Sequence, residues 1–187
     1  MILPIVAYGD AVLRKKCEDI AKDYPNLQKL IDDMFDTMEK ARGVGLAAPQ
    51  IGKAIRLFVV DSERMTDDDD DTPNAEGIRE VFINAKILEE TGKEWAYEEG
   101  CLSIPSIRED VSRKPKVVIQ YYDRNFNLKE ETFEGLTARV IQHEYDHIEG
   151  KLFIDYLKPL KRSLLKGKLE NISKGKVDVS YKMKFPK

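Results

Sequence analysis

The chain has 187 residues, 42% of them hydrophobic, and a formal net charge of −3 at pH 7. Its length and composition are typical of a soluble globular protein with a self-sufficient core. They exclude a chain that is strongly basic as a whole, and the two cysteines are too few for a disulfide scaffold. A membrane span is also excluded, because no apolar run approaches about 18 residues.

Residues 1–10 are apolar, but the stretch is short and no basic segment precedes it. They predict neither a secretory signal nor an arginine-rich transit peptide. We therefore expect the protein to be cytoplasmic. An organelle of bacterial origin is the alternative if a transit peptide has been removed.

Apolar residues recur every three or four positions after Asn26, at Leu27, Leu30, Ile31, Met34, Phe35 and Met38. This period predicts a helix with one apolar face. Asn26 is the expected N-cap and Gly43 the expected C′ residue. The next segment, 43–52, is rich in glycine and proline, and we expect it to be an irregular loop.

Strands are predicted by five runs rich in Val, Ile, Phe and Tyr, at 56–61, 80–85, 93–97, 116–122 and 128–133. A second helix is expected from Gly135 or Leu136 to Gly150, and a third, lysine-rich helix from Pro159 to near Gly175. Strands grouped between helices predict an α+β fold. We expect mixed or antiparallel sheets packed around the second helix.

The strongest chemical signal is the HExxH motif of that second helix, which begins at His143 and ends at His147. A spacing of four residues places both imidazoles on one helix face, where they can hold one metal ion. They are the only two histidines of the chain, and this favours metal binding over two structural histidines.

Glu144 follows the first histidine and has Ile141 and Ile148 on its own side of the helix. We expect this apolar niche to raise the pKa of Glu144 toward neutral pH. A general acid or base needs such a pKa.

Two histidines need a third protein ligand if one position is to stay open for water. Cys101 is a candidate, because it lies before a turn-prone segment and a thiolate binds Fe(II), Zn(II) or Co(II) tightly. The alternative is a small buried hydrophobic residue, which is the role expected for Cys17.

The loop at 43–52 is a third candidate element. Gly43 and Gly45 permit close approach of a ligand, and Pro49 stiffens the chain just before Gln50. A side-chain amide held in this way can donate to a developing oxyanion.

Three segments together resemble the signature motifs of the peptide deformylases: GxGxAAPQ at 43–50, EGCLS at 99–103 and QHExDH at 142–147. The resemblance implies a hydrolase that removes the N-formyl group from the formyl-methionine of newly synthesised polypeptides and releases formate. It implies one divalent metal per chain, physiologically Fe(2+), for which Zn(2+), Ni(2+) or Co(2+) can substitute. Ile148 departs from the leucine that is common in the family.

The resemblance also implies individual roles. It assigns metal binding to three residues, Cys101, His143 and His147. Glu144 would be the general acid/base, moving a proton from the attacking water to the departing amine. Gln50 and the backbone N–H of Leu102 would form the oxyanion hole, and Gly45 would lie along the substrate backbone.

Two segments differ in charge from the rest. Residues 67–71 are five consecutive aspartates, which predict a solvated surface loop near 66–76 rather than a calcium site. Residues 158–187 contain ten basic and two acidic side chains, so they carry +8 and the rest of the chain carries −11. We therefore predict a catalytic metallohydrolase domain over 1–160 and a basic C-terminal helix or tail over 161–187.

The basic tail indicates an anionic partner such as RNA, or else a solubilising, partly disordered terminus. Some members of the resembled family dock a basic C-terminal helix near the ribosomal exit tunnel, which makes the ribosome the expected partner. We expect no DNA and no membrane partner.

Two other classes of function compete at this stage. A zinc endopeptidase is the usual owner of HExxH, but it recruits a later His or Glu as third ligand, and the chain has no third histidine. A non-catalytic, metal-stabilised module would lose the general acid/base, whereas Glu144 and Gln50 are both present. The choice of substrate would distinguish a deformylase from an endopeptidase. The effect of replacing Glu144 would distinguish either enzyme from a non-catalytic module.

Overall fold

The computed structural model describes residues 1–65 and 77–187, so the predicted aspartate loop at 67–71 lies outside the described residues. Within these two ranges the α-helices are α1 (Leu27–Lys40), α2 (Gly135–Ile148) and α3 (Pro159–Ser173). The strands are β1 (Ile5–Val6), β2 (Gly45–Ala47), β3 (Leu57–Asp61), β4 (Arg79–Thr91), β5 (Trp95–Cys101), β6 (Ile104–Arg113), β7 (Lys116–Tyr122), β8 (Leu128–Glu134) and β9 (Met183–Lys184). Short 3₁₀ helices lie at Ala11–Arg14, Ala48–Ile51, Glu63–Met65 and Phe153–Tyr156.

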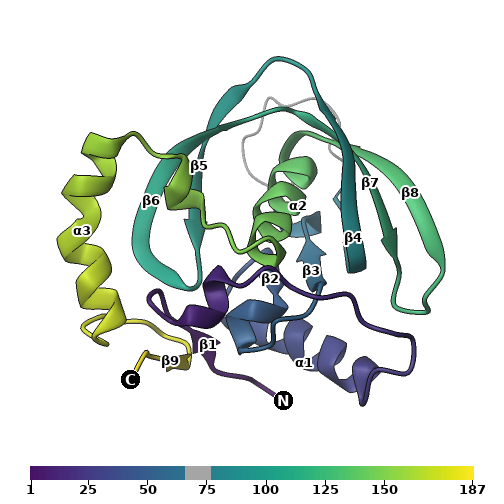
Figure 1. The fold of residues 1–187 in the computed structure, drawn as a ribbon, viewed down its shortest axis with the longest axis horizontal. Helices are drawn as coiled ribbons and strands as arrows, with labels where there is room; N and C mark the ends of the chain where they lie inside the picture. Colours follow the sequence, from purple (N-terminus) through teal and green to yellow (C-terminus); the bar gives the residue numbers. More distant parts are fainter. Residues whose placement is uncertain (66–76) are drawn as a thin grey trace.

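Helix α2 lies at the centre, between a five-stranded sheet and the β5–β6 hairpin (Figure 1). The sheet has the order β2-β3-β4-β7-β8 and is antiparallel throughout. A separate parallel pair, β1 with β9, joins the two ends of the chain. This arrangement confirms the predicted α+β fold with the HExxH helix at its centre.

Helix α1 covers one side of the sheet with the apolar stripe that the sequence predicts. All six residues of the stripe are buried, and they pack with residues of β1, β2, β3 and β4 in one cluster. Helix α2 contributes Ala138, Val140, Ile141 and Ile148 to a second cluster with β3, β4 and β7. The sheet therefore has apolar contacts to both helices.

The ends of the helices follow the expected glycines in two of three cases. Gly150 and Gly175 have φ angles of 75° and 76° and occupy the left-handed position after α2 and α3, as predicted. After α1 the prediction is wrong by one residue, because Arg42 takes the left-handed position with φ 58°. Gly43 comes next and donates its N–H to the Met38 carbonyl at 2.9 Å.

At the other end of α1, Asn26 is the N-cap residue, as predicted. It is left-handed, with φ 56°, and its side chain makes no capping hydrogen bond.

The sequence misses β6 and shortens β5. Pro105 and the charged run 108–110 disfavour a strand by propensity, but pairing with β5 provides the backbone partners for this segment. The strand also buries Ile104, Ile107 and Val111 in a third cluster. The prediction of an irregular loop at 43–52 is wrong as well, because β2 pairs with β3 and a 3₁₀ helix follows.

The basic C-terminal segment begins with α3, the predicted third helix. Leu165, Leu169 and Ile172 of α3 are buried in the third cluster, together with residues of β6. The chain then returns to β1 through β9 (Figure 1). Among the described residues, no helix is both long and apolar enough to span a membrane.

Candidate metal centre and active site

The three predicted metal ligands come together at the end of β5. Cys101 is the last residue of that strand, and His143 and His147 lie one turn apart on α2. Their ligand atoms all lie within 4.8 Å of one another. Cys101 Sγ is 3.4 Å from His147 Nε2. The β5–β6 register shifts between Gly100 and Cys101, where the strand reaches the helix.

This donor set fits a divalent transition metal. His143 Nδ1 is 2.9 Å from a Glu99 carboxylate oxygen, so Nε2 is the ring nitrogen that can face a metal. Burial lowers the pKa of His147 well below its usual value, which favours the neutral imidazole that metals bind. One thiolate and two imidazoles suit Fe(II), Zn(II), Co(II) and Ni(II) alike.

Glu99 holds the metal-binding helix through a buried network. Its carboxylate accepts two hydrogen bonds from Arg113, at 2.7 and 3.0 Å, and one from Arg139 at 2.8 Å. Burial favours the neutral acid, but the bonds with His143 and Arg113 outweigh it and hold the pKa of Glu99 well below its usual range. The carboxylate therefore stays charged and orients the His143 ring.

The network continues along α2, to the residue one turn after His143. Arg113 also donates to Asp146 at 2.8 Å, and the Tyr156 hydroxyl donates to the same carboxylate oxygen at 2.8 Å. Arg113 therefore links β6 to both histidine positions. It reaches His143 through Glu99, and it reaches the helix next to His147 through Asp146. Sequence reasoning quoted Glu99 and Asp146 within motifs but gave neither a role, and it did not find Arg113.

Glu144 occupies the apolar niche that the sequence predicts. It is 4% exposed, with Ile141 and Ile148 fully buried nearby on the helix. Burial raises the pKa of Glu144 to about 7. Its Oε2 atom has no hydrogen-bond partner among the described residues, so it is available to a proton-bearing group.

Gly45 lies directly against Glu144. A Cβ atom added to this glycine would lie 2.5 Å from Glu144 Oε1 and 2.7 Å from its Cγ. Only glycine therefore lets β2 pass the carboxylate at this distance.

The Gln50 amide points toward the cysteine ligand. Its Oε1 accepts from the Ala47 N–H at 2.9 Å, which fixes the direction of the amide. Its Nε2 donates to Cys101 Sγ at 3.4 Å and to the Ser103 hydroxyl at 3.2 Å. A developing oxyanion nearby would carry negative charge and would therefore be a stronger acceptor than the neutral Ser103 hydroxyl.

Leu102 lies in the turn between β5 and β6, outside both strands. Its N–H therefore does not belong to the β5–β6 ladder, and it lies next to Cys101. Both predicted oxyanion donors thus come from segments that meet at the cysteine.

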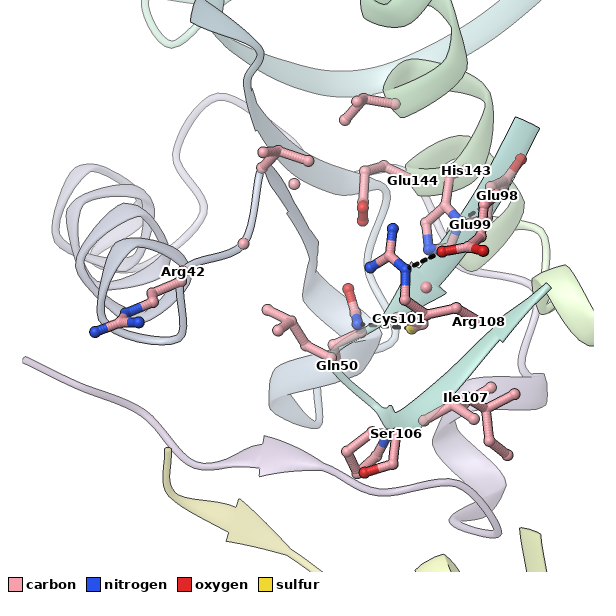
Figure 2. Close-up of a pocket in the computed structure, with 18 of the residues that line it drawn as sticks. Arg42, Gln50, Glu98, Glu99, Cys101, Ser106, Ile107, Arg108, His143 and Glu144 are labelled. Carbon is pink, nitrogen blue, oxygen red and sulfur yellow. Dashed lines mark hydrogen bonds and ion pairs between the residues drawn. The ribbon is translucent and has the colours of Figure 1, made fainter. Parts of the chain in front are cut away.

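Most of the site residues line one open pocket of about 850 Å³: Gly45, Gln50, Glu99, Cys101, Leu102, His143 and Glu144. Figure 2 shows Glu144, His143, Cys101 and Gln50 around the same space. Charged side chains form part of the wall, among them Arg42 and Arg108, and the C-terminal segment 178–181 closes another part. A pocket of this size can take a short peptide end.

Cys17 takes no part in the site. It is 5% exposed, and burial raises its pKa to about 11. The prediction of a buried hydrophobic role for this cysteine is confirmed.

Comparison with known sequences gives one family. A sequence model described as polypeptide deformylase matches residues 2–163. A peptide deformylase of Christiangramia forsetii is 59% identical over 100% of this chain and 97% of its own length. One of Flavobacterium psychrophilum is 56% identical over 99% of this chain and 97% of its own length.

Solved structures agree with the sequence comparison. A peptide deformylase from Legionella pneumophila has a TM-score of 0.81 and 41% identity, covering 94% of this chain and 98% of its own. One from Ehrlichia chaffeensis has a TM-score of 0.82 and 32% identity, covering 95% of this chain and 99% of its own.

Replacing Glu99 by Gln is expected to weaken metal binding by about 10- to 100-fold, because His143 loses the charged partner that orients its ring. The same change removes the negative charge between Arg113 and Arg139, so the free energy of unfolding should fall as well. Competition with a chelator measures the affinity, and denaturant unfolding measures the stability.

The neighbouring Glu98 provides a matched control, because its carboxylate is exposed and pairs with the exposed Arg108. Glu98→Gln should leave both metal affinity and unfolding free energy within experimental error of wild type. Equal metal affinities for the Glu99→Gln and wild-type proteins would contradict the role given to Glu99.

Proposed function

Because the chain belongs to the polypeptide deformylase family, we propose that its pocket is where the N-formyl group is removed from newly synthesised polypeptides, with release of formate. The observation that carries this proposal is the Cys101, His143 and His147 cluster, because two of its members, Cys101 and His143, line the same pocket as Glu144. The N-terminal formyl-methionine is the substrate end that the family implies.

The metal would be held by Cys101, His143 and His147, and Fe(2+) is the proposed physiological ion. A divalent metal bound there would act as a Lewis acid, lowering the pKa of a water molecule and polarising the formyl carbonyl. Zn(2+), Ni(2+) or Co(2+) would fit the same donor set.

Glu144 is the proposed general acid/base. Its carboxylate is buried in the pocket with one oxygen free of partners among the described residues. A pKa of about 7 suits both halves of the reaction. The carboxylate accepts the proton of the attacking water and delivers it to the departing amine nitrogen.

The negative charge that develops on the formyl oxygen needs donors that are already in place. Gln50 Nε2 and the Leu102 N–H are the proposed donors, because both lie beside Cys101. Losing one donor of this kind typically costs about 10²- to 10³-fold in kcat. Gly45 would lie along the substrate backbone while leaving room for Glu144.

The direct test is formate release from a formyl-Met tripeptide. Protein purified anaerobically would be loaded in parallel with Fe(II), Ni(II) and Zn(II). We expect turnover with Fe(II), and the relative rates rank the metals. No turnover with any metal, despite one bound ion per chain, would discard the function.

In the same assay Glu144→Gln should abolish turnover, because the amide cannot accept the proton of water. Bound metal should remain near the wild-type level, since Glu144 is not one of the three ligands. Activity within tenfold of wild type would show that the role of Glu144 is wrong.

Gly45→Ala should reduce turnover by about 100-fold or more, since the new methyl group must displace the Glu144 carboxylate. Metal content should stay unchanged. Gly167→Ala is the matched control, because a Cβ at Gly167 of α3 meets nothing within 4 Å. A Gly45→Ala enzyme as active as the Gly167→Ala enzyme would refute the steric argument.

Action on nascent chains in the cytoplasm, in contact with the ribosome, is a further part of the proposal. Residues 158–187 carry net positive charge, and α3 buries one face while its basic side chains stay exposed. Leu160 and Leu164 of the same helix are 74% and 72% exposed. This surface suits ribosomal RNA and adjoining protein.

Surface substitution tests the ribosome contact better than truncation, which would remove the buried Leu165 and Leu169. Replacing Arg162, Lys166 and Lys168 by Gln should weaken co-sedimentation with ribosomes. The slope of log affinity against log salt should become shallower by about 2 to 3.

The control replaces three exposed lysines elsewhere, Lys22, Lys53 and Lys93, by Gln, which changes the net charge equally. It should sediment almost as the wild type does. Unchanged sedimentation of the α3 variant at low salt would reject the contact.

A further inference from the structure

The C-terminal segment is built into the pocket by pairing with the N-terminus. The Ile5 N–H donates to the Lys182 carbonyl at 2.9 Å, and the Ala7 N–H donates to the Lys184 carbonyl at 2.8 Å. This parallel pairing of β1 with β9 holds residues 178–181 against the pocket, which they line. They lie outside the residues that match the family, 2–163.

Tyr181 connects this segment to the turn after the cysteine ligand. Its hydroxyl donates to the Leu102 carbonyl at 2.8 Å. Its ring is partly buried and packs, as Leu102 does, against the cluster formed by α1 and the sheet. The hydroxyl is therefore held in place by packing at the ring and by β9 two residues further on.

The next residue of the turn is held from two other sides. The Tyr8 N–H donates to the Ser103 carbonyl at 2.8 Å. The Ser103 hydroxyl accepts from Gln50 Nε2 at 3.2 Å. Successive carbonyls of the turn are thus bound by the C-terminal and the N-terminal segments.

We propose that Tyr181 is a positioning residue for deformylation: its hydroxyl holds the Leu102 peptide so that the Leu102 N–H points at the formyl oxygen. The inference rests on the proposed role of Leu102 in the oxyanion hole. The N–H and the carbonyl of Leu102 belong to different peptide planes. The two planes meet at the Leu102 Cα. With the plane after this atom held by Tyr181 and the chain before it held in β5, little rotation about φ and ψ of Leu102 remains through which the N–H could turn away.

When an oxyanion donor is held less firmly but is still present, only part of its stabilisation of the transition state is lost. The formyl carbonyl of the bound substrate carries little charge, so substrate binding changes less than transition-state binding does. Loss of the Tyr181 hydroxyl should thus appear in kcat, while KM stays nearly constant. A purely structural tyrosine would show no such separation.

The test compares Tyr181→Phe with wild type in the formate assay at saturating and limiting formyl-Met tripeptide. We expect kcat to fall about 5- to 30-fold while KM stays within twofold of the wild-type value. The fall in kcat should be smaller than the one caused by removing an oxyanion donor completely, because the Leu102 N–H is still present. Bound metal should match the wild type, and the thermal midpoint should fall only slightly, because one hydrogen bond is lost while the ring and its packing are kept.

Tyr24→Phe is the matched control. Tyr24 packs against the same cluster but does not line the pocket, so its kinetics should equal those of the wild type. A Tyr181→Phe enzyme with kcat within twofold of wild type, or with a change in KM alone, overturns the inference and leaves the proposed function intact. Absence of formate release by the wild type overturns the proposed function and this inference together.

Discussion

The metal site depends on one carboxylate that is removed from solvent and surrounded by positive charge. Glu99 of β5 joins Arg113 of β6 and both Arg139 and His143 of α2, so three side chains from two other elements share its two oxygens. Burying a charge is costly unless it is paired and hydrogen-bonded. The hydrogen bonds of the network offset the cost of burying the Glu99 charge. They also place the hairpin that carries Cys101 against the helix that carries the histidines.

The remaining groups of the pocket are arranged around this fixed junction. Gly45 brings β2 against Glu144, and the 3₁₀ helix after β2 directs Gln50 at the cysteine. The two chain ends then meet at β1 and β9 and bind the turn at 102–103. Glu144 and both histidines thus come from α2, whereas Cys101, Gly45 and Gln50 come from three other segments. Each segment is held by contacts of its own.

Several features of the fold follow from local sequence alone. The apolar period after Asn26 and the glycines after α2 and α3 predicted helices that the structure contains, because side-chain spacing and left-handed φ are local properties. Strand β6 and the β2 segment were missed for the opposite reason. Both are short of strand-forming residues, and what makes them strands is backbone pairing with the neighbouring β5 and β3, which residue propensity does not register.

The same division applies to the site. HExxH places two imidazoles on one face of any helix, so the sequence by itself determined that His143 and His147 face a common point with Glu144 between them. Cys101 became a ligand candidate through its motif and the resemblance that the motif supports. The contacts of Glu99, Arg113 and Tyr181 join residues up to 79 positions apart. Such pairings leave no periodic or local signal, and only the tertiary structure decided them.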